Sequence, residues 1–399
     1  MENICYPKPQ MPITNDYVLS CSNCRQQYPK NQLQTFCTQC GSSPIVVKYS
    51  LEITSSAQVI EPAERSMWRY SKILPLANPQ NRISLGEGWT PILPLSNLAR
   101  RLSLENLLLK DESFNPTGSF KARGLSMAVS KAKELGVETC IVPTAGNAGG
   151  ALSAYCAKGQ MQAIVVMPSH TPVAFQKECL AFGAALILVD GLIHDCARKV
   201  AAIKQEINCF DISTMKEPYR LEGKKTLGYE IAEQLNWELP DVVLYPAGGG
   251  TGLIGIWKAF QEMKQMGWVK NIPTKMIAIQ AENCQPLVAT VNGWQESAAS
   301  YEGSATVANG LAVPRPFAER MMLKVLAQSN GDVLGISETE IAENLKEMAK
   351  AEGLLVAPEG AALLAGLKRL LKLNKIERHH KVLLLNTGFA YKYLDNFSF

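Results

Sequence analysis

Short apolar runs alternate along most of this chain with longer stretches of helical spacing. Predicted strands lie near residues 106–110, 139–143, 163–167, 185–189, 241–245, 276–280 and 381–385. Predicted helices lie near residues 122–135, 149–158, 195–206, 223–235, 253–266, 337–350 and 359–373. Strands that are apolar throughout are buried on both faces, and helices between them allow parallel pairing. The alternation therefore predicts an α/β fold of doubly wound, mostly parallel sheets.

The composition of the chain excludes several classes of protein. Hydrophobic residues make up 47% of the 399 residues, enough for large buried cores, and the formal net charge is only +4. Because no block of basic residues is present, the charge gives no support to nucleic-acid binding. No apolar run reaches the roughly 18 residues of a transmembrane helix, and residues 1–7 lack the pattern of a secretory signal. We therefore expect a cytoplasmic protein that binds neither nucleic acid nor membrane.

One lysine stands at a turn between a predicted strand and a predicted helix. The turn Asn115–Lys121 reads N-P-T-G-S-F-K and follows the apolar run 106–110. Ser119 is a candidate N-cap, which would place the Lys121 amine beside free N–H groups at the positive end of the helix dipole. An amine there is costly to protonate and becomes a better nucleophile. Lys121 is therefore a candidate Schiff-base lysine, and a solvated surface lysine is the alternative.

Three further loops follow predicted strands. They are Thr144-Ala145-Gly146-Asn147-Ala148, the segment Pro246–Gly252 with its run G-G-G-T-G, and Asn386-Thr387-Gly388. A glycine run between a strand and a helix lets backbone N–H groups close on a phosphate. A nucleotide site is poorly supported, because G-x-x-x-x-G-K-[ST] is absent and the glycines do not fit G-x-G-x-x-G.

Taken in order, these four loops resemble those of the fold-type-II pyridoxal-phosphate enzymes, from about residue 80 to the C-terminus. That group includes threonine synthase, threonine dehydratase, serine racemase and the relatives of cysteine synthase. The resemblance implies two lobes with pyridoxal 5'-phosphate between them, held as a Schiff base on Lys121, which also moves protons at the substrate carbons.

The resemblance also implies how the loops divide the binding of cofactor and substrate. Asn147 would hydrogen-bond the ring hydroxyl of the cofactor, and Thr387 would face the pyridine nitrogen. The cofactor phosphate would lie in the cradle formed by Gly248, Gly249, Gly250, Thr251 and Gly252. The substrate carboxylate would be held by the loop Thr144, Ala145, Gly146 and Asn147.

Four cysteines near the N-terminus have metal-ligand spacing. Cys21 and Cys24 form one C-x2-C pair, and Cys37 and Cys40 form a second pair after a spacer of 12 residues. Four thiolates suit tetrahedral zinc, so we expect a small zinc ribbon over residues 16–50. Two disulfides are unlikely in an intracellular chain, and an empty vestigial knuckle is the main alternative.

The cysteine module and a second segment narrow the resemblance to threonine synthase and the related cysteate synthase. The segment 217–226 reads E-P-Y-R-L-E-G-K-K-T and resembles the threonine-synthase segment in which an arginine meets the substrate phosphate. Arg220 is the matching residue, and a guanidinium suits a phosphate because it offers bidentate donors. Lys224 and Lys225 are expected to face solvent on the following helix. Glu359 is expected to be a helix cap or an ion-pair partner.

The expected activity is conversion of O-phospho-L-homoserine and water to L-threonine and phosphate, a carbon–oxygen lyase reaction. A second hypothesis is another fold-type-II enzyme, such as a threonine or serine dehydratase or a β-replacement enzyme of the cysteate-synthase kind. Ala122 after the lysine and the loops G-G-G-T-G and T-A-G-N favour this second hypothesis, because threonine synthases commonly have F-K-D, G-N-x-G-N and S-T-G-N there. A third hypothesis is a non-enzymatic zinc-binding scaffold.

The expected domain organisation follows from the same resemblance. Residues 51–125 and 215–399 form the large cofactor-binding lobe, and residues 126–214 form the small lobe. The segment 294–310, rich in Ser, Ala and Gly, is expected to be a surface loop that can cover the site. The expected partners are a small-molecule amino-acid substrate and a second copy of the chain, in a homodimer.

Overall fold

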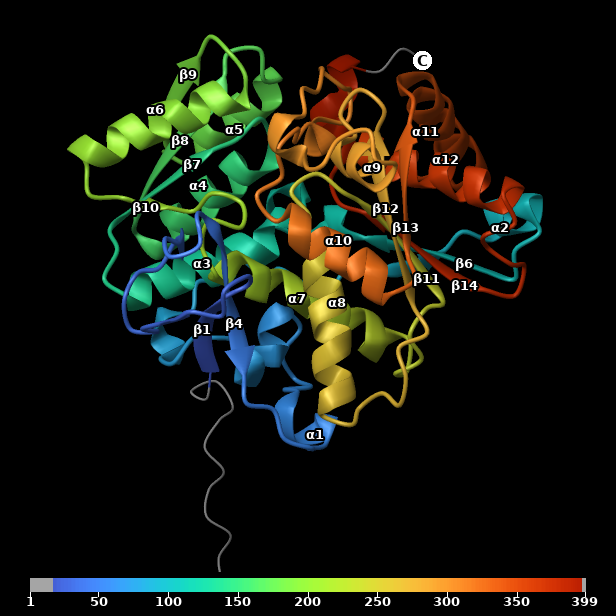
Figure 1. Cartoon of the computed structure of the whole chain (residues 1–399), viewed down its shortest axis with the longest axis horizontal. Helices are drawn as coiled ribbons and strands as arrows, with labels where there is room; N and C mark the ends of the chain where they lie inside the picture. The colour runs from blue at the N-terminus through green and yellow to red at the C-terminus, as the bar shows by residue number, and fades with distance from the viewer. Residues whose placement is uncertain (1–16, 397–399) are drawn as a thin grey trace, which may run out of the picture.

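A computed structural model describes residues 17–396 of the chain, and its strands form three sheets (Figure 1). The large sheet has the order β13-β12-β11-β14-β6-β5, and the small sheet has the order β10-β7-β8-β9. A third sheet, β2-β1-β4-β3, belongs to the N-terminal part of the chain. Helices cover the large and small sheets, so the predicted α/β class is confirmed.

The large sheet is parallel except at one edge. Its strands are β5 (Ile92–Pro94), β6 (Asn106–Asp111), β11 (Val242–Pro246), β12 (Lys275–Ala281), β13 (Asp332–Ile336) and β14 (Lys381–Asn386). Only β5 runs antiparallel, against β6. The central strands β11 and β14 are buried along nearly their whole length, as strands covered on both faces must be.

The small sheet is parallel throughout and lies in the upper left of Figure 1. Its strands are β7 (Thr139–Pro143), β8 (Gln162–Pro168), β9 (Ala185–Val189) and β10 (Phe210–Asp211). The helices that follow β7, β8 and β9 in the chain are α4 (Asn147–Gly159), α5 (Val173–Ala181) and α6 (Ile193–Glu206).

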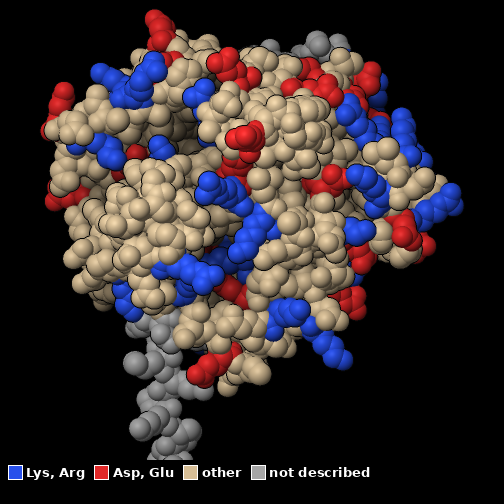
Figure 2. Space-filling model, viewed as in Figure 1, with Lys and Arg blue, Asp and Glu red and all other residues tan. Residues whose placement is uncertain are grey.

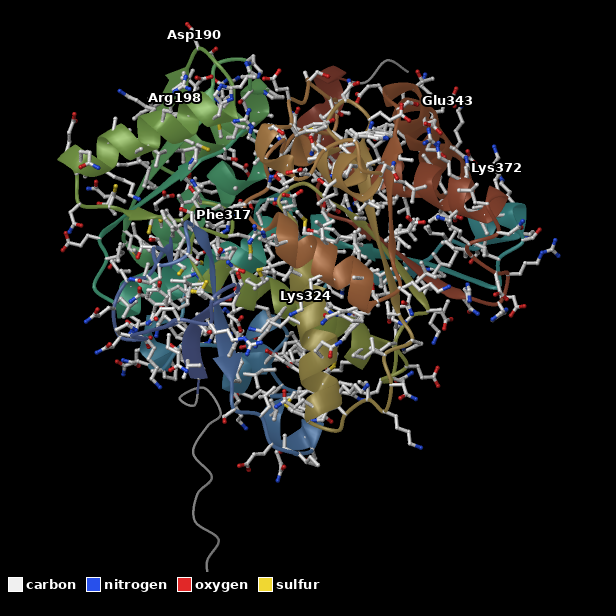
Figure 3. All side chains as sticks on the ribbon, viewed as in Figure 1. Asp190, Arg198, Phe317, Lys324, Glu343 and Lys372 are labelled. Carbon is white, nitrogen blue, oxygen red and sulfur yellow. The ribbon has the colours of Figure 1, made fainter. Side chains whose placement is uncertain are left out.

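The N-terminal sheet is small and antiparallel, with strands β1 (Tyr17–Cys21), β2 (Gln27–Tyr28), β3 (Phe36–Cys37) and β4 (Ser43–Tyr49). Phe317, labelled near the middle of Figure 3, packs edge-to-face against Phe36 with 5.9 Å between the ring centroids. The cysteine module is thus fastened to the loop before α10 (Glu319–Gln328). Figure 2 shows basic side chains gathered over this region and acidic ones scattered around it.

Eight further α-helices lie within residues 17–396. They are α1 (Ser56–Val59), α2 (Ser96–Leu102), α3 (Lys121–Glu134), α7 (Tyr219–Gln234), α8 (Thr251–Gln265), α9 (Pro286–Val291), α11 (Glu338–Glu352) and α12 (Pro358–Lys372). Helix α7 begins four residues earlier than the predicted range, so Arg220 lies inside its first turn. Within residues 17–396 no helix is both long and apolar enough to span a bilayer.

Candidate active site

The turn that carries Lys121 is fastened to the end of β14. The backbone of Ser119 forms an isolated β-bridge with Gly388, and the Phe120 N–H donates to the Thr387 carbonyl at 3.1 Å. Helix α3 begins at Lys121 with Phe120 as its N-cap, so the prediction that Ser119 is the N-cap is wrong. The Ser119 backbone is extended to make the bridge, and its buried hydroxyl has no hydrogen-bond partner among the described residues.

Lys121 lies on the wall of a cavity of about 250 Å³ between the large and small sheets. Burial and, to a smaller extent, the positive charge of Arg220 lower the pKa of its amine to about 8, while Glu359 opposes the shift. The amine also lies 4.2 Å from the centre of the Phe120 ring. An amine with a pKa near 8 is far more often unprotonated at neutral pH than an ordinary lysine, so the nucleophilic role predicted for it is chemically favoured.

The lowered pKa gives a testable pH dependence for cofactor binding. The unprotonated amine is the form that attacks an aldehyde, so the rate should rise with pH and level off above the pKa of Lys121. A fall from 10.5 to about 8 raises the reactive fraction at pH 7 by about 300-fold. We expect the rate of reconstitution of cofactor-free protein, followed by absorbance, to have a midpoint near pH 8. A midpoint above pH 10 would contradict this environment.

The asparagine loop joins β7 to α4 on the small-sheet side of the cavity. Thr144, Ala145, Gly146 and Asn147 all line the cavity together with Lys121. The Thr144 hydroxyl accepts from the Gly146 N–H at 3.1 Å, which tightens the turn before the helix. Asn147 is the first residue of α4, so the loop stands at a helix N-terminus that suits a carboxylate.

The glycine loop joins β11 to α8 on the opposite side of the cavity. Gly248, Gly249, Gly250 and Thr251 line it, whereas Gly252 packs against the Tyr245 hydroxyl instead. Gly250 has a φ of +75°, and a Cβ added at Gly248 would lie 2.1 Å from the Gly310 carbonyl oxygen. Because these positions leave no room for side chains, the backbone itself forms the cavity wall at the start of α8. This cradle fits a phosphate bound by main-chain N–H groups.

Thr387 lies at the carboxyl end of β14 and also lines the cavity. Its carbonyl accepts the hydrogen bond from the Phe120 N–H, which ties Thr387 to the residue directly before Lys121. The structure therefore brings the lysine, the asparagine loop, most of the glycine loop and Thr387 around one cavity. This arrangement fits a flat, phosphate-bearing aldehyde that bonds to Lys121.

Arg220 is not among the residues that line this cavity, but its charge acts on Lys121, which does line it. Arg220 is 1% exposed, and its Nη1 donates to the Ile212 carbonyl at 2.7 Å. Its Nε and Nη2 have no partner among the described residues. Burial lowers the pKa of Arg220, while Glu217 and Asp211 oppose that shift. A buried guanidinium with two free donors is costly unless an anion completes it.

The prediction that Lys224 and Lys225 face solvent is wrong. Both are fully buried, because α7 is covered by α3 and α8. Lys225 forms ion pairs with Glu222 at 2.8 Å and Glu262 at 3.0 Å. Lys224 donates to the Phe120 carbonyl, and its amine lies 3.6 Å from the centre of the Phe120 ring. Burial and the charges of Lys121 and Arg220 lower the pKa of Lys224 well below its usual value.

Glu359 and Tyr393 both line the cavity, although neither was predicted from the sequence to do so. Glu359 was expected to cap a helix or form an ion pair, but its Oε1 accepts from the Gly310 N–H at 2.7 Å and from the Tyr393 hydroxyl at 3.2 Å. Tyr393 comes from the C-terminal segment η8 (Ala390–Asn396) and is 2% exposed. No motif marks Tyr393 in the sequence, because only the tertiary fold brings it to the cavity. The segment 294–310 does reach the cavity, through Asn309 and Gly310, as predicted.

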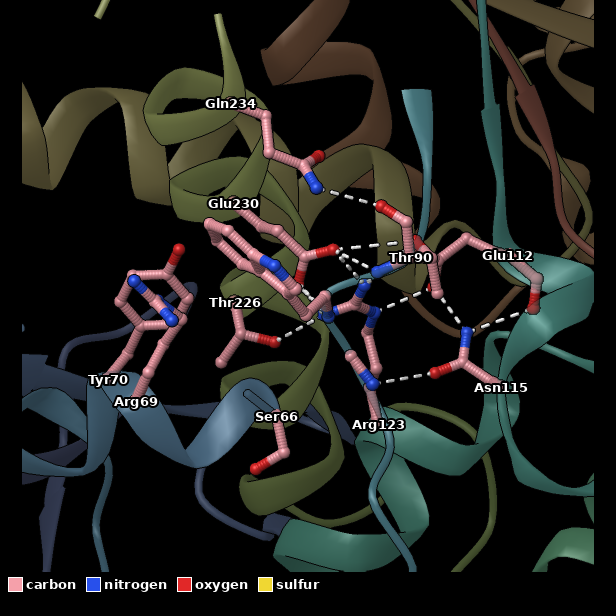
Figure 4. A network of polar contacts seen from close by, with 12 residues as sticks. Ser66, Arg69, Tyr70, Thr90, Glu112, Asn115, Arg123, Thr226, Glu230 and Gln234 are labelled. Carbon is pink, nitrogen blue, oxygen red and sulfur yellow. Dashed lines mark hydrogen bonds and ion pairs between the residues drawn. The ribbon is translucent and has the colours of Figure 1, made fainter. Parts of the chain in front are cut away.

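A buried ionic network contacts the lysine turn through Asn115 (Figure 4). The Arg123 guanidinium binds Glu112 through Nε at 2.6 Å and Nη2 at 2.7 Å, and it binds Glu230 through Nη1 at 2.8 Å. Asn115, the first residue of the turn, donates to a carboxylate oxygen of Glu112 at 2.9 Å. Glu230 is also paired with Lys110. The network therefore connects the end of β6, the turn and the first turn of α3.

The four cysteines of the N-terminal module converge on one point. Their sulfur atoms all lie within 4.8 Å of one another, with Sγ–Sγ distances of 3.5 Å for Cys21–Cys40 and 3.6 Å for Cys24–Cys37. None of the four is in a disulfide. Sulfur atoms around tetrahedral zinc, with Zn–S bonds of about 2.3 Å, lie about 3.8 Å apart. The cluster therefore fits a zinc ion and not two disulfides.

Comparison with known proteins agrees with this site. A family described as pyridoxal-phosphate dependent enzymes matches residues 83–388, more than half of the chain. The chain belongs to this family, and its cofactor is pyridoxal phosphate.

Within that family the chain is similar to threonine synthases. The enzyme of Methanocaldococcus jannaschii is 32% identical over 375 residues, covering 93% of this chain and 92% of the relative. The enzyme of Methanosarcina acetivorans is 32% identical over 379 residues, covering 94% and 92%. Among solved structures, threonine deaminase isoform 2 of Solanum lycopersicum has a TM-score of 0.66 at 19% identity, covering 93% of this chain and 97% of that chain. That identity shows a shared fold only.

Proposed function

We propose that this enzyme converts O-phospho-L-homoserine and water to L-threonine and phosphate. The observation that carries the phosphate part of the proposal is Arg220, a buried guanidinium whose Nε and Nη2 have no partner among residues 17–396. Its positive charge also lowers the pKa of Lys121, the lysine that would carry the cofactor. The threonine synthases that cover more than nine-tenths of this chain support the same activity.

The residues of the cavity divide the work of the reaction. The main chain at Gly248–Gly250 would hold the cofactor phosphate, Asn147 would bond its ring hydroxyl, and Thr387 would face its pyridine nitrogen. When bound, pyridoxal phosphate stabilises negative charge that develops on the substrate carbons. Lys121 removes and returns protons at those carbons.

The substrate is held at two further points. The loop of residues 144–147 binds its carboxylate at the start of α4, and Arg220 binds its phosphate and stabilises the charge of the departing group. Two fixed anchors hold the carbon chain between them in one orientation relative to Lys121, which lowers the entropic part of the barrier. The γ-carbon–oxygen bond breaks as phosphate leaves, and the γ-carbon gains a proton to become the methyl group. A water molecule supplies the hydroxyl on the β-carbon of threonine.

A second candidate is a dehydratase that releases ammonia from L-serine or L-threonine, favoured by Ala122 in place of a common aspartate. Reconstituted protein should be incubated with O-phospho-L-homoserine and, separately, with L-serine and L-threonine. We expect phosphate release and threonine formation from the first and little ammonia from the others. Rapid ammonia release without phosphate release would favour the dehydratase.

Replacing Arg220 by alanine should distinguish a loss of phosphate binding from a loss of activity toward all substrates. Two charge-assisted hydrogen bonds are lost with the phosphorylated substrate, so kcat/KM for O-phospho-L-homoserine should fall roughly 100-fold or more. The residual release of ammonia from L-threonine should change less than threefold, because this substrate has no phosphate. Equal losses with both substrates would remove the role assigned to Arg220.

We propose that Cys21, Cys24, Cys37 and Cys40 hold a structural zinc ion. Purified protein should contain about one zinc per chain, and Cys24→Ser together with Cys40→Ser should remove it and lower the unfolding temperature. The matched control is Cys284→Ser, a buried thiol outside the cluster. A double variant that lacks zinc but unfolds at the same temperature as the wild type would contradict the proposal.

The homodimer, the cytoplasmic location and the domain boundaries stay predictions.

A further inference from the structure

The C-terminal segment η8 reaches the asparagine loop and contacts the amide that would meet the cofactor. Lys392 lies at the centre of the contact: its Nζ donates to the Thr117 carbonyl at 2.7 Å, to Asn147 Oδ1 at 3.1 Å and to both carboxylate oxygens of Glu178 at 2.8 Å. Glu178 is on α5 of the small-sheet side and Thr117 is in the lysine turn. Lys392 therefore joins the two sides of the cavity.

Lys392 decides which way the Asn147 amide points. An ammonium group can only donate hydrogen bonds, so the amide atom that faces it must be the carbonyl oxygen. The amide nitrogen then lies on the other side, where it donates to the Tyr393 hydroxyl at 3.3 Å. A Cβ added at Gly388 would lie 3.3 Å from that nitrogen, so the nitrogen borders the backbone next to Thr387.

The hydroxyl of Tyr393 has one donor and one acceptor role in the hydrogen bonds of this segment. It is 2% exposed, and its hydroxyl donates to Glu359 Oε1 at 3.2 Å while accepting from Asn147. Burial and the negative charge of Glu359 raise the pKa of Tyr393 well above its usual value, so the hydroxyl keeps its proton. An amide nitrogen has two hydrogens, and Tyr393 takes only one of them. The other remains for a group in the cavity.

We propose that Lys392 and Tyr393 are positioning residues that lock the Asn147 amide as a hydrogen-bond donor toward the ring hydroxyl of the bound cofactor. A fixed donor stabilises the ionised form of that ring oxygen, whereas a flipped amide would present its carbonyl oxygen and favour the protonated form. The C-terminal segment would thus set the protonation of the cofactor ring oxygen. This inference rests on the proposed placement of the cofactor on Lys121.

The test is the pH titration of the visible absorbance band of the reconstituted holoenzyme, with Tyr393→Phe and Lys392→Gln. Phenylalanine keeps the ring packed against Phe175, whose centroid is 5.5 Å away, and removes only the hydroxyl. Loss of one oriented hydrogen bond should raise the midpoint of the titration by up to about one pH unit in each variant. Lys392→Arg, which can also only donate, should restore the wild-type midpoint.

Tyr391→Phe is the matched control, because Tyr391 is in the same segment but is 60% exposed. It should titrate as the wild type does. Spectra of wild type, Tyr393→Phe and Lys392→Gln that agree at every pH would overturn the proposal. A colourless wild-type holoenzyme would instead overturn the cofactor placement on which the proposal rests, so the two failures are distinguishable.

Discussion

Replacement of Lys121 by alanine is expected to lower turnover by roughly 10³–10⁴-fold and to abolish the visible band of the bound cofactor. The lysine lies on the cavity wall beside the asparagine loop, and burial lowers the pKa of its amine to about 8. The substitution removes both the bond to the cofactor and the group that moves protons. Turnover is measured as phosphate release, and cofactor binding is measured by the absorbance spectrum.

The matched control is Lys133→Ala, because Lys133 is on the same helix but is exposed, and its amine donates to the Gly159 carbonyl. This variant should retain the wild-type spectrum and turnover. Activity of Lys121→Ala within tenfold of the wild type would show that the lysine is not the reacting group.

Replacement of Arg123 by methionine is expected to destabilise the protein by about 3–5 kcal/mol. Arg123, Glu112, Glu230 and Lys110 are fully buried, so removing the guanidinium leaves two carboxylates in the interior with one cation. The measurement is equilibrium unfolding in urea. Arg101→Met, at an exposed position on α2, should change the stability by less than about 0.5 kcal/mol. Equal stabilities of the two variants would contradict the account of the network.

The same network predicts an acid transition. Burial would raise the pKa of Glu230, but Arg123 and Lys110 lower it to about 2. An unfolded glutamate titrates near 4.3, so the ionised carboxylate favours the folded state above that pH. This stabilisation should be lost as the pH falls from about 4.3 toward 2. In Arg123→Met the folded pKa rises, so its stability should start to fall at a higher pH than that of the wild type.

Much of the fold was predictable because buried parallel strands have a strong sequence pattern. The run at 381–385 became β14 and the run at 241–245 became β11, each followed by a loop of the cavity. Loops that follow parallel strands meet at one edge of a sheet, which is why sequence order alone brought the glycine loop and Thr387 together.

The failures have identifiable physical causes. Lys224 and Lys225 are polar and were predicted to be exposed, but α7 is covered on both sides. Lys225 is paired with Glu222, and burial lowers the pKa of Lys224 well below its usual value. Ser119 is a good N-cap by residue type, yet its backbone is needed for the bridge to Gly388. Tyr393 reaches the cavity and Lys392 reaches Asn147 by tertiary packing, which leaves no local sequence pattern.

The central claim is that the cofactor bonds to the Lys121 amine, and reduction with borohydride followed by peptide mass spectrometry tests it most directly. The reconstituted enzyme should give one modified peptide, with the cofactor attached at Lys121. The buried amine of Lys224 lies against the same Phe120 ring, so Lys224 is the alternative site of attachment that the experiment must distinguish. Modification at Lys224, or no modified peptide from fully reconstituted protein, would contradict the account.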